Sequence, residues 1–183
     1  WGYNGGSGHR SSGGSTSPTS TIVPAKKPDQ PLIAASSLAL TVDKSDRGTV
    51  TVPLQKVIDT INKAATEAGK QGKTANGIGV CLKTENPAGI KALEIVLTQP
   101  VLKQLIESKV QQFEIDGRFL SINFDLEALK ELQSQSTGDV TISFTPATAL
   151  SDEAKALIGT RTVYNITLSH AKDGKTLDIT SLG

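Results

Sequence analysis

The sequence contains few of the residues that support covalent or metal chemistry. Its 183 residues include one cysteine, two histidines and no methionine. One cysteine cannot form an internal disulfide, and it excludes a two-cysteine redox motif and a cysteine-rich zinc site. His9 lies in a glycine- and serine-rich tail and His170 at the end of a predicted strand, so neither is expected to activate Cys81. We therefore interpret Cys81, in the apolar run 78–82, as a buried core residue.

Strong net charge and long apolar runs are also missing. Lysine plus arginine number 19 and acidic residues 18, which gives a net charge of +1. The chain therefore has no strong attraction to nucleic acid, and Lys26 and Lys27 form too small a basic run to bind it. No run of about 18 apolar residues is present, so we predict no membrane insertion. Aromatic residues make up 4% of the chain, a usage that suits a stable exported domain.

The first thirty residues have the composition of a linker. Glycine and serine dominate the beginning, and threonine and proline follow. Such a segment has too little apolar surface to offset the entropy lost on ordering. We predict a flexible linker over residues 1–30 and one folded module over 31–183, in a chain that begins at Trp1 as a processed product or a fragment. The short apolar patch Thr21–Pro24 is an exception that could add to a sheet as an edge strand.

Three strands are predicted to lead directly into short amphipathic helices. The junctions lie at 50–58, 95–102 and 122–129, where alternating apolar residues give way to a helical spacing. A fourth helix is predicted to begin at Ser151, because a serine cap is followed by Asp152 and Glu153. We expect the following residues to face the core: Val57, Ile58, Ile61 and Ala65 in the first helix, Val101, Leu102, Leu105 and Ile106 in the second, Leu126, Leu129 and Leu132 in the third, and Leu157 and Ile158 in the fourth.

The helix and strand boundaries are indicated by turn and capping residues. Thr98 or Gln99 is predicted to cap the second helix, with Pro100 in its first turn, and Asp125 to cap the third. Asp116-Gly117 predicts a two-residue hairpin turn between strands 110–115 and 118–124. Further hairpins are predicted for 37–42 with 49–52 and for 162–169 with 175–180. About eight or nine strands and four short helices predict an α+β fold, with an antiparallel or mixed, sandwich-like sheet core and helices at the strand connections.

Four segments carry a resemblance to a known family. They are 138–143, 150–159, 161–167 and 174–180, in which strand patterns alternate with the capped fourth helix. Over roughly residues 45–183 the chain resembles modules of bacterial, Gram-positive-type cell-surface proteins that carry surface-layer homology domains. This resemblance implies a non-enzymatic surface module of an S-layer-type protein, located outside the cell at the cell wall. In that family a further strand region usually follows the position of Gly183.

The candidate site residues are each explained by a structural role. Asp116 and Asp125 flank one strand as paired carboxylates, but a tight turn and a helix cap account for them. Asp43, Asp46, Asp139, Asp152 and Glu153 show no calcium-loop spacing and are interpreted as turns and caps. The sequon Asn165-Ile166-Thr167 lies inside a predicted strand, and Tyr164 is assigned to the core or to the sheet face. Trp1 and Tyr3 form a weak platform for a sugar ring. We predict no catalytic, cofactor-binding or metal-binding residue.

Two functions remain open from the sequence. The first is a non-enzymatic structural or interaction module that spaces or joins neighbouring domains of the same polypeptide at the cell wall. The second is a carbohydrate-binding accessory domain of a secreted polysaccharide-degrading enzyme, whose partner would be an extracellular glycan. A variant of the first has the strip Thr21–Pro24 of one molecule complete the sheet of another in head-to-tail assembly.

Overall fold

A computed structural model describes residues 20–85, 88–147, 151–159, 162–172 and 175–179. The described chain forms two sheets and four α-helices, and this confirms the predicted α+β class. The strands are β1 (Thr21–Val23), β2 (Leu32–Ala39), β3 (Thr41–Val42), β4 (Arg47–Thr51), β5 (Ile78–Glu85), β6 (Ala92–Leu97), β7 (Val110–Asp116), β8 (Ser121–Asp125), β9 (Val140–Pro146), β10 (Tyr164–Lys172) and β11 (Lys175–Asp178). The helices are α1 (Leu54–Lys70), a 3-10 turn η1 (Thr74–Asn76), α2 (Gln99–Glu107), α3 (Leu126–Gln135) and α4 (Asp152–Ile158).

Both sheets are mixed. Sheet A has five strands in the order β1-β2-β5-β7-β8, and sheet B has six in the order β11-β10-β9-β6-β4-β3. The pairs β2–β5, β5–β7 and β4–β6 are parallel, and the other neighbours are antiparallel. Because parallel neighbours need a crossover, the helices α1 and α2 lie in the connections between them. The predicted antiparallel-or-mixed sheet is thus a pair of mixed sheets.

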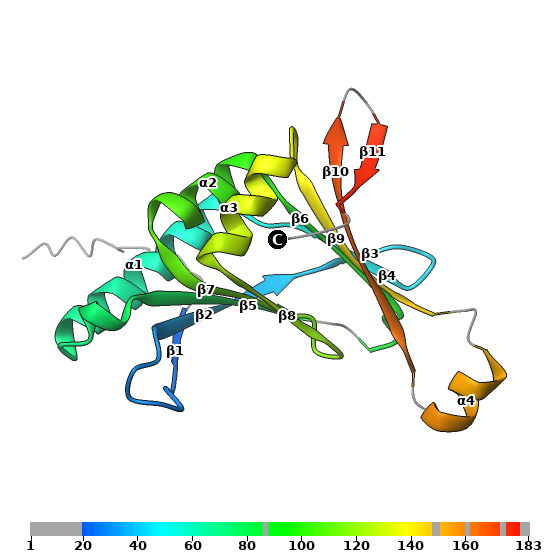
Figure 1. Cartoon of the computed structure of the whole chain (residues 1–183), viewed down its shortest axis with the longest axis horizontal. Helices are drawn as coiled ribbons and strands as arrows, with labels where there is room; N and C mark the ends of the chain where they lie inside the picture. The colour runs from blue at the N-terminus through cyan, green and yellow to red at the C-terminus, as the bar shows by residue number, and fades with distance from the viewer. Residues whose placement is uncertain (1–19, 86–87, 148–150, 160–161, 173–174, 180–183) are drawn as a thin grey trace, which may run out of the picture.

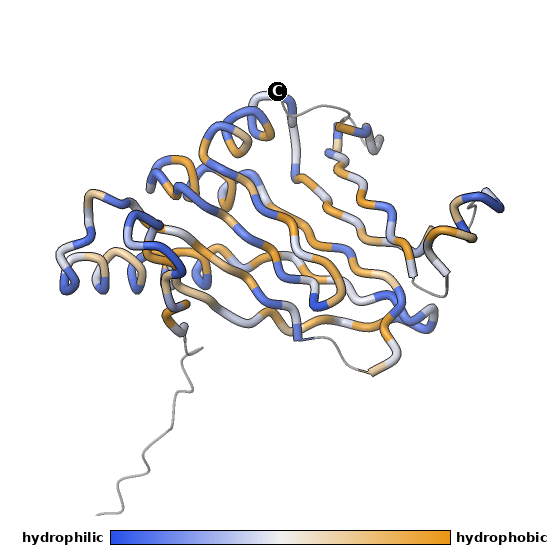
Figure 2. Tube along the Cα trace, turned by 60° about the horizontal axis from the view of Figure 1, so that its bottom comes forward, coloured by the Kyte–Doolittle hydropathy of each residue, from blue (hydrophilic) through white to orange (hydrophobic). Residues whose placement is uncertain are grey.

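Three helices cover one face of sheet A (Figure 1). α1 packs on β2 and β5, α2 on β7, and α3 on β7 and β8. Their apolar stripes share one buried cluster with residues from the strands of both sheets, among them Leu82, Phe113, Ile95 and Phe144. The hydropathy trace in Figure 2 shows apolar positions recurring along these strands. Helices and both sheets therefore share one main core, and two smaller buried clusters lie beside it on sheet A.

The strand-to-helix junctions are as predicted. β4, β6 and β8 lead into α1, α2 and α3 after at most two intervening residues. Thr98 is the N-cap residue of α2, although its side chain makes no capping hydrogen bond, and Asp139 Oδ1 accepts from the backbone N–H of Gln99 instead (3.1 Å). Asp125 caps α3 by accepting a hydrogen bond from the N–H of Ala128 (2.8 Å). The predicted cap of α4 is also present, because Ser151 Oγ accepts from the N–H of Ala154 (3.2 Å).

Three sequence predictions about local packing are wrong. The β7–β8 hairpin is present, but Asp116 pairs with Ser121, so four residues connect the strands and Asp-Gly is not a two-residue turn. The longer loop lets Phe119 and Leu120 pack against the core. In α1, Ala65 is exposed, because the buried stripe runs through Val57, Thr60, Ile61, Ala64 and Ala68. In α4, Leu157 is 89% exposed, and the side chain of Ile158 lies outside the description.

The other predicted hairpins are present in modified form. β3 pairs with β4 through only two residues, since residues 37–39 of the predicted strand 37–42 belong to β2 in the other sheet. β10 and β11 pair antiparallel, with Lys172 opposite Lys175, as the sequence predicts for the turn between them. Residues 173 and 174, which form the predicted turn, lie outside the described residues.

The patch Thr21–Val23 forms β1 at the edge of its own sheet. Thr21 pairs with Ala35 and Val23 with Ile33, antiparallel. The side-chain amide of Asn76 donates to the carbonyl of Pro28 (2.8 Å), which attaches the following turn to η1. The predicted linker range 1–30 therefore contains, from residue 20 onwards, chain that belongs to the folded module. No helix in the described ranges is long and apolar enough to cross a membrane.

Candidate functional site

The two carboxylates weighed as an acid–base pair lie apart. Asp116 pairs with Ser121 at one end of the β7–β8 ladder, and Asp125 pairs with Gln112 at the other end. Asp116 Oδ1 accepts from the backbone N–H of Arg118 (2.9 Å), and Asp125 caps α3. Each carboxylate thus has the turn or cap role that its sequence position indicates, and the two do not face a common substrate position.

The five acidic residues considered for calcium are spread over different elements. Asp43 accepts from the backbone N–H groups of Ser45 and Arg47 in a turn. Asp46 forms an ion pair with Lys91 (2.6 Å), and the side-chain hydrogen bond to Asp46 raises the pKa of Lys91. Asp139 accepts from the N–H of Gln99, Asp152 pairs with Lys155 (3.4 Å), and Glu153 lies in the first turn of α4. No group of three or more His, Cys, Asp or Glu that could hold a metal ion is found among the described residues.

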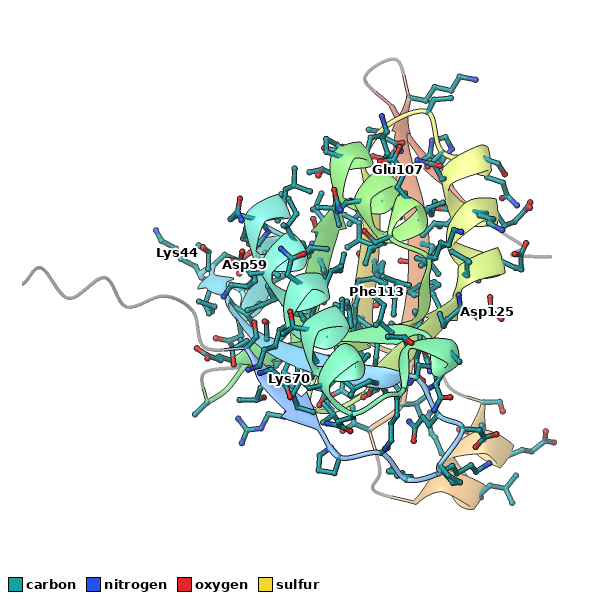
Figure 3. The ribbon with its side chains drawn as sticks, turned by 90° about the vertical axis from the view of Figure 1, so that its left-hand side faces the viewer. Lys44, Asp59, Lys70, Glu107, Phe113 and Asp125 are labelled. Atoms are coloured by element: carbon teal, nitrogen blue, oxygen red, sulfur yellow. The ribbon has the colours of Figure 1, made fainter. Side chains whose placement is uncertain are left out.

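Several other charged side chains also lie apart from one another and do not form a cluster. Figure 3 shows Lys44, Asp59, Lys70 and Glu107 at places well apart from one another, while Phe113 lies in the middle of the molecule between helices and strands. In α1, Glu67 accepts a hydrogen bond from Lys70 (2.9 Å), and this contact lowers the pKa of Glu67. The Glu67–Lys70 contact is a solvated ion pair of the kind that contributes little to stability.

Cys81 lies on β5 as a buried side chain, as predicted, with 3% exposure. It packs with Ile33, Ala35 and Val23 on the face of sheet A opposite the helices. Burial, followed by the negative charge of Glu114, raises its pKa to about 11. A thiol with this pKa is protonated at neutral pH, so Cys81 is unsuited to act as a nucleophile.

His170 has a structural role that sequence reasoning missed. It is buried in β10, two residues before the strand ends, where it pairs with Leu177 of β11, and its Nδ1 accepts a hydrogen bond from the backbone N–H of Thr137 (3.3 Å). The same connection is held by Gln99, whose side-chain amide donates to Ser136 Oγ (3.0 Å). The contacts fasten the α3–β9 connection to β10 and to the beginning of α2. Only a prediction of which strands neighbour each other could have revealed them.

A chain of hydroxyl groups lies between β2 and α1 and was also missed. Thr60 Oγ1 donates to the carbonyl of Lys56 (2.7 Å), so its lone pair accepts from Ser36 Oγ (2.6 Å). Ser36 in turn accepts from Ser20 Oγ (2.7 Å). Each hydroxyl proton of this hydrogen-bonded series has an acceptor. This explains how the side chains of Ser36 and Thr60 are buried without creating a reactive group.

A cleft of about 570 Å³ lies at the carboxyl ends of α1 and α2, beside the beginning of β5. Small side chains such as Ala65 and Ala68 line much of it. Its amides are already engaged, because Gln111 donates to the carbonyl of Lys109 (3.0 Å) and Asn76 to that of Pro28. A ligand site needs polar groups aimed into the cavity, and in this cleft the described amides are used within the protein.

Aromatic side chains form no exposed platform in the described part of the chain. Phe113 and Phe124 stack with ring centroids 6.2 Å apart, and both are buried. Phe119 stacks on Tyr164 at 4.6 Å and contacts the buried Phe144 edge-on. The predicted role of Tyr164 in the core or on the sheet face agrees with this stacking. Trp1 and Tyr3 lie outside the described residues.

Exposed large apolar side chains lie on β3, α1, α4 and β10, and the most exposed of them in the described residues is Leu157 on α4. Leu157 is 89% exposed and Ile166 is 40% exposed. Figures 1 and 2 both show α4 extending away from the body beyond one end of β10. Asn165 of the predicted sequon is exposed on the same strand. We call α4 together with Tyr164–Leu168 the arm of the molecule.

Comparison of the chain with models of known families, with curated proteins and with solved structures finds no match. The arm and the satisfied polar groups of the body are therefore the observations on which a function is based.

Proposed function

We propose that this chain is a non-enzymatic structural and interaction module of an extracellular surface protein associated with the cell wall. Its work is to space or join neighbouring domains. The observation that carries the proposal is the arrangement of the polar side chains, which serve caps, turns, ion pairs and strand connections throughout the described body. A linker-like N-terminal composition and the resemblance to surface-layer modules support the location.

The decisive experiment measures catalysis directly. Purified protein is incubated with panels of polysaccharides and peptides, and product release is followed over several days. We expect no release above a heat-denatured sample, because the described carboxylates, histidine and thiol are either engaged or separated. Turnover that persists after repurification and is lost on denaturation would contradict the proposal.

A joining role also predicts effects on neighbouring domains. In a tandem protein with a folded domain on each side, the module is expected to hold its neighbours at a narrow distribution of distances. Fluorescence energy transfer between labels on the neighbours measures this distribution. A Gly/Ser segment of equal residue number provides the control, because it behaves as a flexible coil. Equal widths for the two proteins would show that the module does not orient its neighbours.

The alternative, carbohydrate binding, has less support from the side chains. Sugar recognition in exported domains commonly uses aromatic rings, whose apolar faces stack while polar edges remain hydrated. Here Phe119 and Tyr164 stack on each other. Specific binding on a glycan array that survives deletion of residues 1–19 would favour the alternative, whereas an array without binding would favour the structural module.

A further inference from the structure

From Tyr164 to Thr167, one side of β10 has no neighbouring strand among the described residues. β11 pairs with Ser169–Lys172, and the last hydrogen bond along this ladder runs from the N–H of Ile179 to the carbonyl of Leu168 (2.7 Å). From Tyr164 to Thr167 the strand pairs with β9 on one side only. No strand of the described chain lies against its other side. In Figure 1, α4 lies beyond the end of β10 and not alongside it.

The direction of the Leu168 carbonyl indicates which backbone groups are open. In an antiparallel ladder, the N–H and C=O of one residue point to the same side, and the side alternates from residue to residue. Because Leu168 points toward β11, Ile166 and Tyr164 point to the same free side. Two donors and two acceptors are thus presented at this edge, with no partner strand in the described ranges.

The other sheet edges, β1, β3, β8 and β11, carry features that oppose pairing, and in β11 these are the charged Lys175 and Asp178. β1 has three residues and is followed by Pro24, and β3 has two residues and is followed by the charged turn that starts at Asp43. β8 ends at the exposed Asp125. Short strands, prolines and charges are the usual protection of an edge against other chains. The segment 164–168 has no charge and no proline, and its register against β9 is regular.

We propose that this edge pairs with the same edge of a second copy of the chain, in antiparallel orientation about a two-fold axis at Asn165. Tyr164 of each copy then lies opposite Ile166 of the other, and their open backbone groups exchange four hydrogen bonds. The axis position follows from the free groups, because pairing centred on Ile166 would place Tyr164 opposite Leu168, whose carbonyl is already occupied by Ile179.

The side chains of the edge are complementary to themselves in this register. Tyr164, Ile166 and Leu168 lie on one face, since they pair with Pro146, Phe144 and Ile142 of β9. The apolar Tyr164 and Ile166 therefore meet each other across the axis, and the uncharged Asn165 meets its own copy on the other face. Aromatic with β-branched pairs stabilise a ladder, and the absence of charge from 164–168 means that no like charges are brought together within the paired segment.

The size of the edge sets the strength of the pairing. In this register Tyr164–Ile166 pair with their copies, and three residues span about 10 Å, which buries much less than the roughly 1,200 Å² of a typical stable interface. Pairing is therefore weak in dilute solution and becomes populated where copies are concentrated side by side. The proposal rests on the proposed joining role and names its partner as a second copy. A monomer in every test below would remove the self-pairing while leaving a role in spacing domains intact.

A disulfide at the axis tests the geometry. Across the free edge Asn165 and its copy form a non-hydrogen-bonded pair, with Cα atoms about 4.5 Å apart, a separation that a disulfide spans. Asn165→Cys is compared with Ser121→Cys, which places a thiol at the exposed edge of sheet A; the native Cys81 is buried in both. Under mild oxidation at equal concentrations, we expect dimer from Asn165→Cys to form at least about tenfold faster. Equal rates would overturn the proposal.

A charge at the edge provides a second and independent measurement. Sedimentation velocity over a wide concentration range is expected to show reversible association of the wild type, and Ile166→Lys is expected to remain monomeric because an inward-pointing charge blocks edge pairing. Ser121→Lys adds the same charge to the other sheet and should behave like the wild type. Circular dichroism and thermal unfolding verify that each variant is folded. Association unaffected by Ile166→Lys, or reduced equally by both variants, would contradict the assignment.

A variant that ends at Ile179 distinguishes the other possible occupant, the chain's own residues 180–183. If those residues cover the edge, their removal increases crosslinking of Asn165→Cys from a negligible rate, and self-pairing of the intact chain is overturned. If a second copy is the partner, the intact and shortened chains crosslink alike.

Discussion

The helices α3 and α4 begin in the same way and end in different environments. Each has a side-chain cap, Asp125 or Ser151, that accepts a hydrogen bond from the N–H three residues later. In α3 the stripe containing Leu129 and Leu132 is buried against strands β7 and β8 and beside α2, whereas Leu157 of α4 is 89% exposed. A cap and an amphipathic pattern therefore determine that a helix forms and where it begins, but burial depends on what the chain places opposite.

The largest expected difference is between the leucines of these two helices. Leu132→Ala removes a fully buried side chain and should lower the free energy of unfolding by about 2–5 kcal/mol. Leu157→Ala should change it by less than about 0.5 kcal/mol. Urea denaturation followed by circular dichroism measures both values. A large loss in Leu157→Ala would show that α4 packs on the body in solution, and the contrast between the two helices would disappear.

The buried hydroxyl chain offers a smaller effect in the body. Thr60→Val keeps the shape of the side chain but deprives Ser36 of its acceptor, so we expect a loss of about 1–3 kcal/mol. The matched change in the arm is Thr167→Val, at an exposed position, with an expected change under about 0.5 kcal/mol. Denaturation midpoints of the two variants provide the comparison. Similar midpoints would mean that the Ser36–Thr60 contact contributes nothing to stability.

Removal of the two capping side chains should affect stability differently, although their hydrogen-bond geometry is alike. Asp125→Ala is expected to destabilise the whole module by about 1 kcal/mol, because α3 is part of the core. Ser151→Ala should increase fraying of α4 without moving the global transition, since few contacts couple α4 to the body. Hydrogen exchange at the amides of Ala128 and Ala154, measured together with urea unfolding, separates local from global effects. A shift of the global transition by Ser151→Ala would weaken the division into body and arm.

The smallest effect concerns Cys81 and appears only in alkali. Because its pKa is raised from 9.0 to about 11 in the folded chain, the native state retains the proton over a range where the unfolded chain loses it. The associated stabilisation is complete below pH 9 and is lost as the pH rises through 11. The free energy of unfolding, measured from pH 8 to 11, should therefore decline more steeply with pH for the wild type than for Cys81→Ala. Parallel profiles would indicate a thiol that water reaches.

Local features could be predicted from the sequence because their causes are local. The cap at Asp125, the Pro100 turn and the strand-to-helix junctions depend on residues a few positions apart. The β7–β8 loop was predicted incorrectly because Asp-Gly indicates a tight turn, while the apolar Phe119 and Leu120 gain more by packing on the core. Leu157 was predicted incorrectly for a different reason. An apolar residue on a short helix was assumed to pack against the core, but no neighbouring element of the described chain buries it.

Strand neighbours could not be read from the sequence. β5 and β6 are consecutive and joined by a turn signature, yet they belong to different sheets, and β2 pairs in parallel with β5 across the whole of α1. The contact of His170 with Thr137 and the open side of β10 both follow from this non-local order. The absence of a reactive cluster was a prediction from residue types and spacing, and direct assays of catalysis and metal binding are its proper test.

The passage of the chain between the sheets has a consequence for how the module comes apart. Leu40 is the single residue between β2 of sheet A and β3 of sheet B, and it packs against the common core. Because the connection is one residue long, a displacement of either sheet from the core also displaces the other sheet. Heating should therefore melt residues 31–147 in one cooperative transition, with equal calorimetric and van't Hoff enthalpies, and a load applied to either sheet would be shared by both.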